Sequence, residues 1–152
     1  MKYIIRVGNY AMGDDGIGLQ LIEALATTEL PPDCHLLELK NDALGLFSYL
    51  VPETSAILIV DCVKMGVAPG DWRLFTPEEV RSIKRVAHAS THEGDLLQII
   101  QLAQATGYTI PPLRILGIQP ESMEPSMELS ATIKERLPEY IDIAHRLMAE
   151  EW

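Results

Sequence analysis

Short apolar runs alternate along the chain with longer segments in which apolar residues recur every three or four positions. The runs at residues 2–7 and 56–60 are rich in β-branched side chains, which is typical of strands that a parallel sheet buries on both faces. Residues 35–39 and 114–118 predict two further strands, and residues 71–75 predict an edge strand whose direction the pattern leaves open. These segments together supply the strands of one sheet.

Helices are expected between these strands. The first covers residues 15–29, and a short helical stretch covers residues 44–50. The apolar spacing of residues 96–103 indicates another helix, and a last one begins after Ser130 as N-cap, where Pro138 should kink or split it. Strands that alternate with helices predict a three-layer, doubly wound α/β domain, with a mostly parallel twisted sheet and helices on both faces. In such folds the ligand binds at the carboxyl ends of the strands, where neighbouring strands lead to opposite faces.

Length, charge and cysteine content narrow the class of protein. A chain of 152 residues suffices for one core, so we expect residues 1–152 to form a single domain. No apolar run approaches the roughly 20 residues that span a bilayer, and the start lacks a signal-peptide pattern, so we expect a cytoplasmic protein with no membrane partner. A formal net charge of −10 disfavours nucleic acid, and two cysteines, Cys34 and Cys62, are too few for a disulfide scaffold.

Acidic residues mark the loop between the first strand and the first helix. The glycines of residues 8–18 match neither G-x-G-x-x-G nor a Walker loop, and the adjacent carboxylates of Asp14 and Asp15 would repel a phosphate group. No nucleotide is therefore expected there, and a metal ligand or a general base suits the position better. The competing interpretation is that either aspartate only caps the helix and complements its dipole.

A third carboxylate follows a buried strand. Asp61 comes directly after the apolar run 56–60, where a charge must be solvated or paired, so it should point into the crevice at the strand end. If the first and third strands are neighbours, Asp15 and Asp61 face each other across that crevice.

A histidine could complete this set of carboxylates. His88 and His92 both precede the helix that contains residues 96–103, and we favour His92, whereas His35 and His145 are interpreted as structural. Two carboxylates and an imidazole from three loops form a mixed oxygen and nitrogen set that suits nickel, zinc or a similar divalent ion with open coordination positions. The candidate residues for catalysis and for metal binding are Asp15, Asp61 and His92.

The ordered set of motifs resembles one known family. It consists of Gly8-Asn9, the run from Asp14 to Gly18, Asp61 after an apolar strand, His92 before a helix, and the run from Gly117 to Ser122. In this order they look like the hydrogenase maturation endopeptidases, over nearly the whole chain. The resemblance implies a flavodoxin-like fold in which Asp15, Asp61 and His92 act as ligands towards nickel. The first of these is often glutamate in the family, and Asp14 is a rival for that role.

The resemblance also implies an activity and a partner. The expected substrate is the precursor of a nickel-containing hydrogenase large subunit, whose C-terminal extension is removed once nickel is in place. The metal is then the nickel of the precursor, with another divalent ion in the isolated protein as an alternative, and no flavin or nucleotide is expected. Either the metal polarises the scissile carbonyl or activates water, or a carboxylate acts as general base in an aspartic-type mechanism. Residues 40–45 replace the family's Gly-Gly-Thr/Ser-like loop, so the substrate subtype stays open.

Other classes of protein fit parts of the pattern. A thiol peptidase would use Cys62 with His92, but strand geometry should turn Cys62 to the face opposite Asp61. The acidic first loop disfavours a flavin binder, and no G-x-S-x-G elbow supports a serine hydrolase. A non-catalytic nickel-binding module that docks on the large subunit during assembly would use the same ligands. Only turnover distinguishes that module from a peptidase, because a peptidase releases the tail from many precursors. We expect the protein to be a monomer that meets its substrate transiently.

Overall fold

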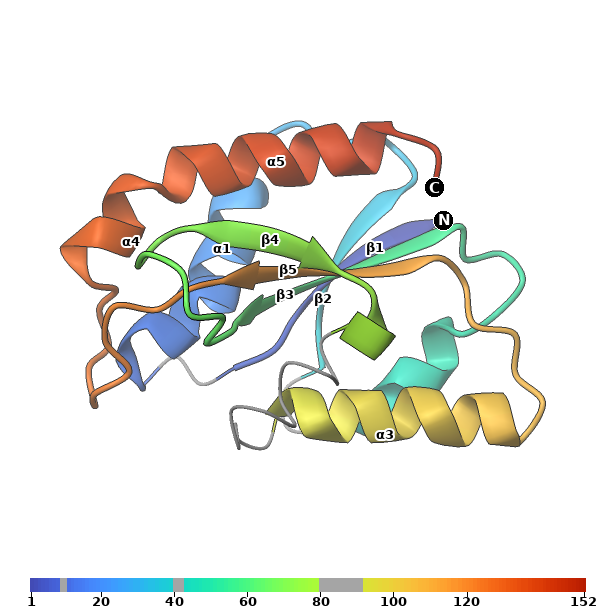
Figure 1. The fold of residues 1–152 in the computed structure, drawn as a ribbon. Helices are drawn as coiled ribbons and strands as arrows, with labels where there is room; N and C mark the ends of the chain where they lie inside the picture. The colour runs from blue at the N-terminus through green and yellow to red at the C-terminus, as the bar shows by residue number, and fades with distance from the viewer. Residues whose placement is uncertain (9–10, 40–42, 80–91) are drawn as a thin grey trace.

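Five strands form one twisted sheet in the computed structural model, which describes residues 1–8, 11–39, 43–79 and 92–152 (Figure 1). Their spatial order is β2-β1-β3-β5-β4. The strands are β1 (Lys2–Arg6), β2 (Cys34–Glu38), β3 (Ala56–Cys62), β4 (Trp72–Phe75) and β5 (Leu113–Ile118). Every predicted strand segment is confirmed, with ends that differ from the prediction by one or two residues.

The strand directions confirm the doubly wound α/β arrangement. β1 pairs in parallel with β2 and β3, and β3 pairs in parallel with β5, so the carboxyl ends of these strands meet at one edge of the sheet. β4 runs antiparallel to β5 at the border of the sheet, which is the direction that the sequence left open. Asp61 and Cys62, expected just after the third strand, belong to β3 because they pair with Gly117 and Ile118 of β5.

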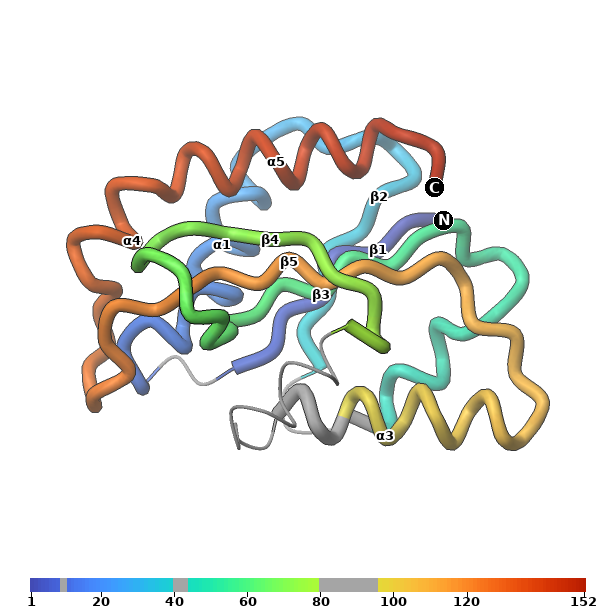
Figure 2. Tube along the Cα trace, in the orientation of Figure 1, coloured from blue at the N-terminus to red at the C-terminus, as the bar shows by residue number. Residues whose placement is uncertain are grey.

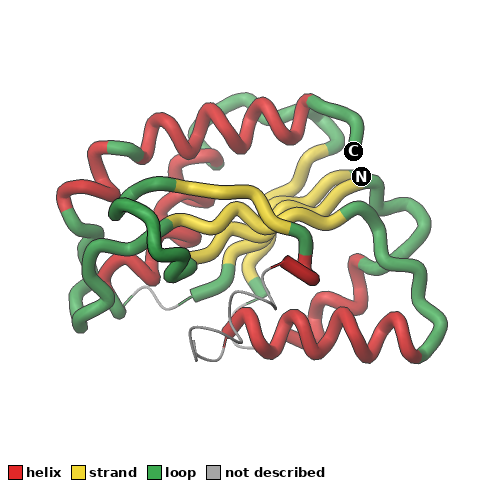
Figure 3. The backbone as a smooth tube through the Cα atoms, viewed as in Figure 1, coloured by secondary structure: helices red, strands yellow, loops and turns green. Residues whose placement is uncertain are grey.

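Helices cover both faces of the sheet (Figure 3). α1 and α5 pack on one face, and α3 and η2 pack on the other. The α-helices are α1 (Ile17–Leu25), α3 (His92–Ala105), α4 (Ala131–Glu135) and α5 (Leu137–Ala149), and the 3₁₀ helices are η1 (Gly13–Gly16) and η2 (Ala43–Tyr49). None of the helices within the described ranges is long and apolar enough to cross a membrane.

The first helix is shorter than predicted at both ends. Its expected start is the 3₁₀ turn η1, in which the N–H of Asp15 donates to the carbonyl of Met12 three residues back. The α-helix ends at Leu25, where the hydroxyls of Thr27 and Thr28 donate to carbonyl oxygens of its last turn. Residues 15–29 are therefore not one helix, and Asp15 lies in the turn before it.

The last helix is split, as expected from Pro138. α4 ends at Glu135 and α5 begins at Leu137, so the proline lies in the first turn of α5, where its missing N–H costs no helical hydrogen bond. Ser130 precedes α4 but makes no side-chain cap. Ser130 is the N-cap residue of α4, as predicted, but its hydroxyl donates to Asp14 and not to the helix.

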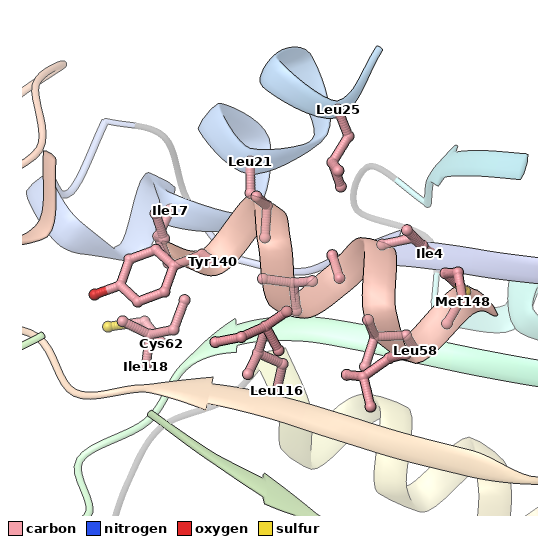
Figure 4. Packing of buried hydrophobic residues seen from close by; sticks show 14 of the residues in the cluster. Ile4, Ile17, Leu21, Leu25, Leu58, Cys62, Leu116, Ile118, Tyr140 and Met148 are labelled. Carbon is pink, nitrogen blue, oxygen red and sulfur yellow. The ribbon is translucent and has the colours of Figure 1, made fainter. Parts of the chain in front are cut away.

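Alternating side chains of β3 divide the core into two layers. Leu58 packs with Leu21 of α1 and Met148 of α5 (Figure 4). Ile59, the next residue, packs on the opposite face with Ile100 of α3. Burial on both faces explains why β3 is a continuous apolar run rather than an alternating one.

Both termini lie at the amino end of the parallel strands (Figure 2). The Lys2 ammonium donates to the Met148 carbonyl at 2.7 Å, which ties the start of β1 to the end of α5. The carboxyl edge of the sheet, where α/β folds bind ligands, is therefore remote from both chain ends.

Replacing Tyr140 with phenylalanine is expected to lower the free energy of unfolding by about 1–2 kcal/mol. The fully buried Tyr140 hydroxyl donates to the Gly70 carbonyl at 2.6 Å, and burial raises the pKa of this phenol to about 12, so it remains a donor at neutral pH. Urea unfolding measures the change. Tyr108→Phe is the control, because Tyr108 is 44% exposed, and its variant should unfold like the wild type.

Candidate active site at the carboxyl edge of the sheet

The carboxyl ends of β1 and β3 lie side by side at this edge. The two strands are hydrogen-bonded neighbours, which meets the condition under which the sequence places Asp15 and Asp61 across from each other. From β1 the chain passes to α1, which packs on one face of the sheet (Figure 1). After β3 and β4, the next described helix that packs on the sheet is α3, and it covers the other face. Neighbouring strands that lead to opposite faces open a crevice at their carboxyl ends. Asp15 and Asp61 belong to the two segments that border it.

Asp61 is a buried carboxylate near the end of β3. Its exposed fraction is 1%, and its Oδ1 accepts the Cys62 N–H at 2.7 Å. Strand alternation places it on the face of Ile57 and Ile59, which α3 covers. Its partner in β5 is Gly117, where a Cβ would lie 3.0 Å from a ring carbon of Phe75, so the glycine keeps this part of the sheet closely packed.

Asp15 lies in η1, pressed against the loop that leaves β1. Its exposed fraction is 8%. Gly8 has a φ of +113°, and a Cβ there would lie 2.3 Å from the Asp15 carbonyl oxygen and 3.2 Å from its Oδ1. Only glycine permits this approach, because it combines a positive φ with the lack of a side chain. The position of Asp15 therefore depends on Gly8.

A second glycine brings the helix onto the strand ends. A Cβ at Gly18, in the first turn of α1, would lie 3.0 Å from the Val7 carbonyl oxygen and 3.2 Å from that of Val60. α1 thus begins directly against the ends of β1 and β3. This contact holds η1 beside the last residues of β3, which is the edge where both predicted carboxylates were expected.

Asp14 has a different environment from Asp15. Its exposed fraction is 1%, and its Oδ2 accepts the N–H groups of Glu121 and Ser122 at 2.9 Å and the Ser130 hydroxyl at 2.8 Å. Its Oδ1 accepts the Ser130 N–H at 2.7 Å. Since both oxygens are occupied by donors from residues 121–130, the geometry disfavours Asp14 as the rival metal ligand. The groups that donate to Asp14 lie outside α1, so the competing interpretation, in which this side chain caps the helix, does not hold for Asp14.

The predicted histidine is the first residue of α3. Figure 1 shows that α3 runs opposite to β5, so the helix starts towards the edge where β3 and β5 end. The side chains of residues 92–95, and His88 altogether, lie outside the described residues. Among the described side chains, which do not include that of His92, no three His, Cys, Asp or Glu residues group closely enough to hold a metal ion.

The two cysteines lie in the α1 and α5 layer of the core. Cys62 is 6% exposed and neighbours Tyr140 and Ile118 (Figure 4), on the face opposite Asp61 as predicted. Burial, with a further contribution from Asp33, raises the pKa of Cys34 to about 11, so that thiol stays protonated at neutral pH. A buried thiol is a poor nucleophile. Because Cys62 is buried on the face of the sheet opposite Asp61, its position argues against the thiol-peptidase alternative.

His35 and His145 are structural, as interpreted from the sequence. His145 Nε2 lies 2.8 Å from the Thr28 hydroxyl and links the end of α1 to α5. The His35 ring lies against the Tyr3 ring, with 5.7 Å between centroids. Neither belongs to the crevice.

Two connections at this edge were not predicted from single residues. Gln119 Oε1 accepts the Met65 N–H at 2.6 Å, which ties the chain after β5 to the chain after β3. The second connection is the set of bonds between Asp14 and residues 121–130 described above. The sequence marks the run Gly117–Ser122 only as a motif of the family, and no local pattern indicates what this run contacts.

The fold and these carboxylates define a doubly wound, flavodoxin-like α/β protein with buried acidic residues at the carboxyl edge of its sheet. The sequence model of the hydrogenase maturation proteases matches residues 19–147, and the chain belongs to that family. Asp61 and His92 lie inside the matched range, and Asp15 lies just before it. The resemblance stated from the motifs is therefore confirmed.

Individual relatives agree with this assignment. The hydrogenase expression/formation protein HupD of Rhodobacter capsulatus is 28% identical over 122 residues, which are 80% of this chain and 58% of HupD. The chain thus spans less than two thirds of that relative. The maturation protease HybD of Thermococcus kodakarensis has a TM-score of 0.76 and 27% identity, covering 97% of this chain and 99% of that one. The maturating endopeptidase HybD of Escherichia coli shares the fold, with a TM-score of 0.84, 24% identity, and 98% and 93% of the two chains covered.

Proposed function

We propose that this protein is an endopeptidase that removes the C-terminal extension of a nickel-containing hydrogenase large-subunit precursor after nickel insertion. Family membership supports the class of reaction and of substrate. The observation that carries the site is the presence of two buried carboxylates, Asp15 and Asp61, on neighbouring segments at one edge of the sheet. Burying a carboxylate costs free energy, and an approaching divalent cation offsets that cost.

The nickel of the precursor is the metal that we assign to this crevice. Asp15, Asp61 and His92 would contact it as oxygen and nitrogen ligands, a donor set that nickel accepts. The enzyme would thereby distinguish a loaded precursor from an empty one, because only the loaded precursor brings a cation to the carboxylates. Recognition and cleavage would then take place at the same edge of the sheet.

Cleavage of the tail requires water, a base and a proton for the leaving amine. Water adds to the scissile carbonyl carbon while a carboxylate of the crevice takes its proton. The C–N bond then breaks, and the proton passes to the new amine of the released tail. A carboxylate in this role makes the enzyme aspartic-type, and a cation next to the carbonyl oxygen would stabilise its negative charge.

Processing is expected only for precursor that carries nickel. The purified protein is mixed with nickel-loaded and with nickel-free precursor, and the products are weighed by mass spectrometry. Loss of a C-terminal fragment from the loaded form alone supports the proposal. As a control, loaded precursor without the enzyme should keep its tail.

Two other outcomes would contradict the proposal in different ways. Stable binding without release of a fragment would favour the non-catalytic assembly module that docks on the large subunit. Equal cleavage of both precursor forms would leave the peptidase but remove the role of nickel in recognition. We also propose that the protein acts as a cytoplasmic monomer, and light scattering of the purified protein tests the monomeric state.

A further inference from the structure

We propose that Asp14 is a positioning residue, which fastens residues 121–130 to the first loop and so holds Asp15 at the edge of the sheet. The inference rests on the proposed function, because it concerns the same site. It assigns the two adjacent aspartates to separate tasks, with Asp14 as the anchor and Asp15 as the group that meets the metal.

The side chain of Asp14 joins segments that are far apart in the sequence. Its four donors are the N–H groups of Glu121, Ser122 and Ser130 and the hydroxyl of Ser130, at 2.7–2.9 Å. All four groups donate, and the two oxygens of the Asp14 carboxylate accept every one of these bonds. Hydrogen bonds to a carboxylate are short and stronger than those between neutral groups.

Backbone bonds continue the same connection. The N–H of Gly13 donates to the Ser126 carbonyl at 2.9 Å, and that of Asp14 donates to the Ser122 carbonyl at 2.9 Å. The Ser126 N–H donates to the Ala11 carbonyl at 3.0 Å, and Met12 forms a parallel bridge with Ser126. We call the bonds between residues 11–14 and 121–130 the Asp14 clasp.

Close packing leaves the clasp little room to shift. Gly13 has a φ of +60°, and a Cβ there would lie 2.8 Å from the Ser122 carbonyl oxygen and 3.0 Å from that of Glu124. The contacts on both sides of Gly13 are backbone atoms, which cannot rotate away as a side chain can. The two segments therefore approach each other as closely as their backbones allow.

The clasp reaches the candidate ligand through the chain itself. Asp15 follows Asp14 directly, its N–H donates to the Met12 carbonyl at 3.2 Å, and its other side rests on Gly8. Asp15 is thus held between the clasp and the loop that leaves β1. Loosening the clasp would release one of these two supports, and misplacing a reacting group by about 1 Å can lower a rate by two orders of magnitude.

The variant Asp14→Asn tests the role of the charge with almost no change in size. Its amide oxygen can keep the three donors around Oδ2, but its NH₂ group then faces the Ser130 N–H, and two donors oppose each other. Ser130→Ala removes the hydroxyl donor alone and leaves the carboxylate charged. We expect hydrogen–deuterium exchange to show lost protection at the amides of residues 13–15 and 126 in Asp14→Asn, and a smaller loss in Ser130→Ala.

The matched control is Leu147→Ala, which opens a cavity in the α5 layer of the core. Leu147 lies in the last turn of α5, beside Met148, whose carbonyl accepts a bond from Lys2 at the amino end of β1. Both Asp14→Asn and Leu147→Ala should lower the melting temperature by several degrees. At a temperature where all variants are folded, Asp14→Asn is expected to lose about 10- to 100-fold in kcat for tail removal. Leu147→Ala should keep the kcat of the wild type.

Three results would overturn the inference. Unchanged exchange in Asp14→Asn would show that its carboxylate does not hold the clasp. Lost protection with unchanged kcat would reduce Asp14 to a contributor to stability, and an equal loss of kcat in Leu147→Ala would make the effect one of global stability. If the wild type itself does not process loaded precursor, the proposed function fails separately, and exchange at the Asp15 amide still decides whether Asp14 positions that residue.

Discussion

Asp61→Asn is expected to lower removal of the precursor tail by about 10²–10⁴-fold, the range in which loss of a positioned acid–base group falls. Asparagine has almost the size of aspartate, and its carbonyl oxygen can still accept the Cys62 N–H that Oδ1 accepts at 2.7 Å. The variant also no longer buries a charge at a position that is 1% exposed. It should therefore stay folded, with a loss in unfolding free energy below about 1 kcal/mol.

Kinetics of this variant separate recognition from catalysis. If Asp61 mainly contacts the nickel of the precursor, KM rises and binding of loaded precursor weakens. If it takes the proton from water, kcat falls while binding persists. Asp71→Asn is the control, because it removes the same charge from a half-exposed carboxylate that pairs with Arg136, and it should process precursor as the wild type does. Normal processing by folded Asp61→Asn would refute the site.

The sequence predicts the strands well because burial on both faces leaves a strong pattern. β3 and β5 are apolar runs that need no long-range information to be recognised as strands. The direction of β4 could not be predicted, since Trp72–Phe75 would read the same whether the chain ran parallel or antiparallel to β5. Direction depends on how the intervening chain returns to the sheet, which no local periodicity records.

The sequence predicts which segments meet at the site, but it does not predict which of the two adjacent aspartates of the first loop faces the metal. β1 and β3 are neighbours in the flavodoxin-like strand order, so the meeting of the first loop with Asp61 could be expected once that order was assumed. Asp14 and Asp15 are equivalent in the sequence, and what distinguishes them is a set of donors more than 100 residues away. Contacts of that separation arise only once the chain has folded.

Gly8→Ala is expected to cost about 3 kcal/mol or more in unfolding free energy, and processing should fall with it even where the protein stays folded. Alanine is strained at a φ of +113°, and its Cβ would lie 2.3 Å from the Asp15 carbonyl oxygen, far inside any real contact. The clash can be relieved only by moving η1 or the end of the loop that leaves β1. Either movement displaces Asp15 from the crevice. Thermal unfolding and tail removal, measured on the same preparation, test both parts.

Gly107→Ala separates the strain of the backbone from the contact with Asp15. Gly107 also has a positive φ, +91°, yet among the described residues no atom lies within 4 Å of a Cβ built there. It should lose only about 1–2 kcal/mol and process precursor normally, because it follows α3 at the far end from the crevice. If both variants lost the same stability and Gly8→Ala kept full activity, the close approach of Gly8 would not position Asp15. A loss of activity in Gly8→Ala alone would instead show that the close contact between Gly8 and Asp15 positions the Asp15 carboxylate for the reaction.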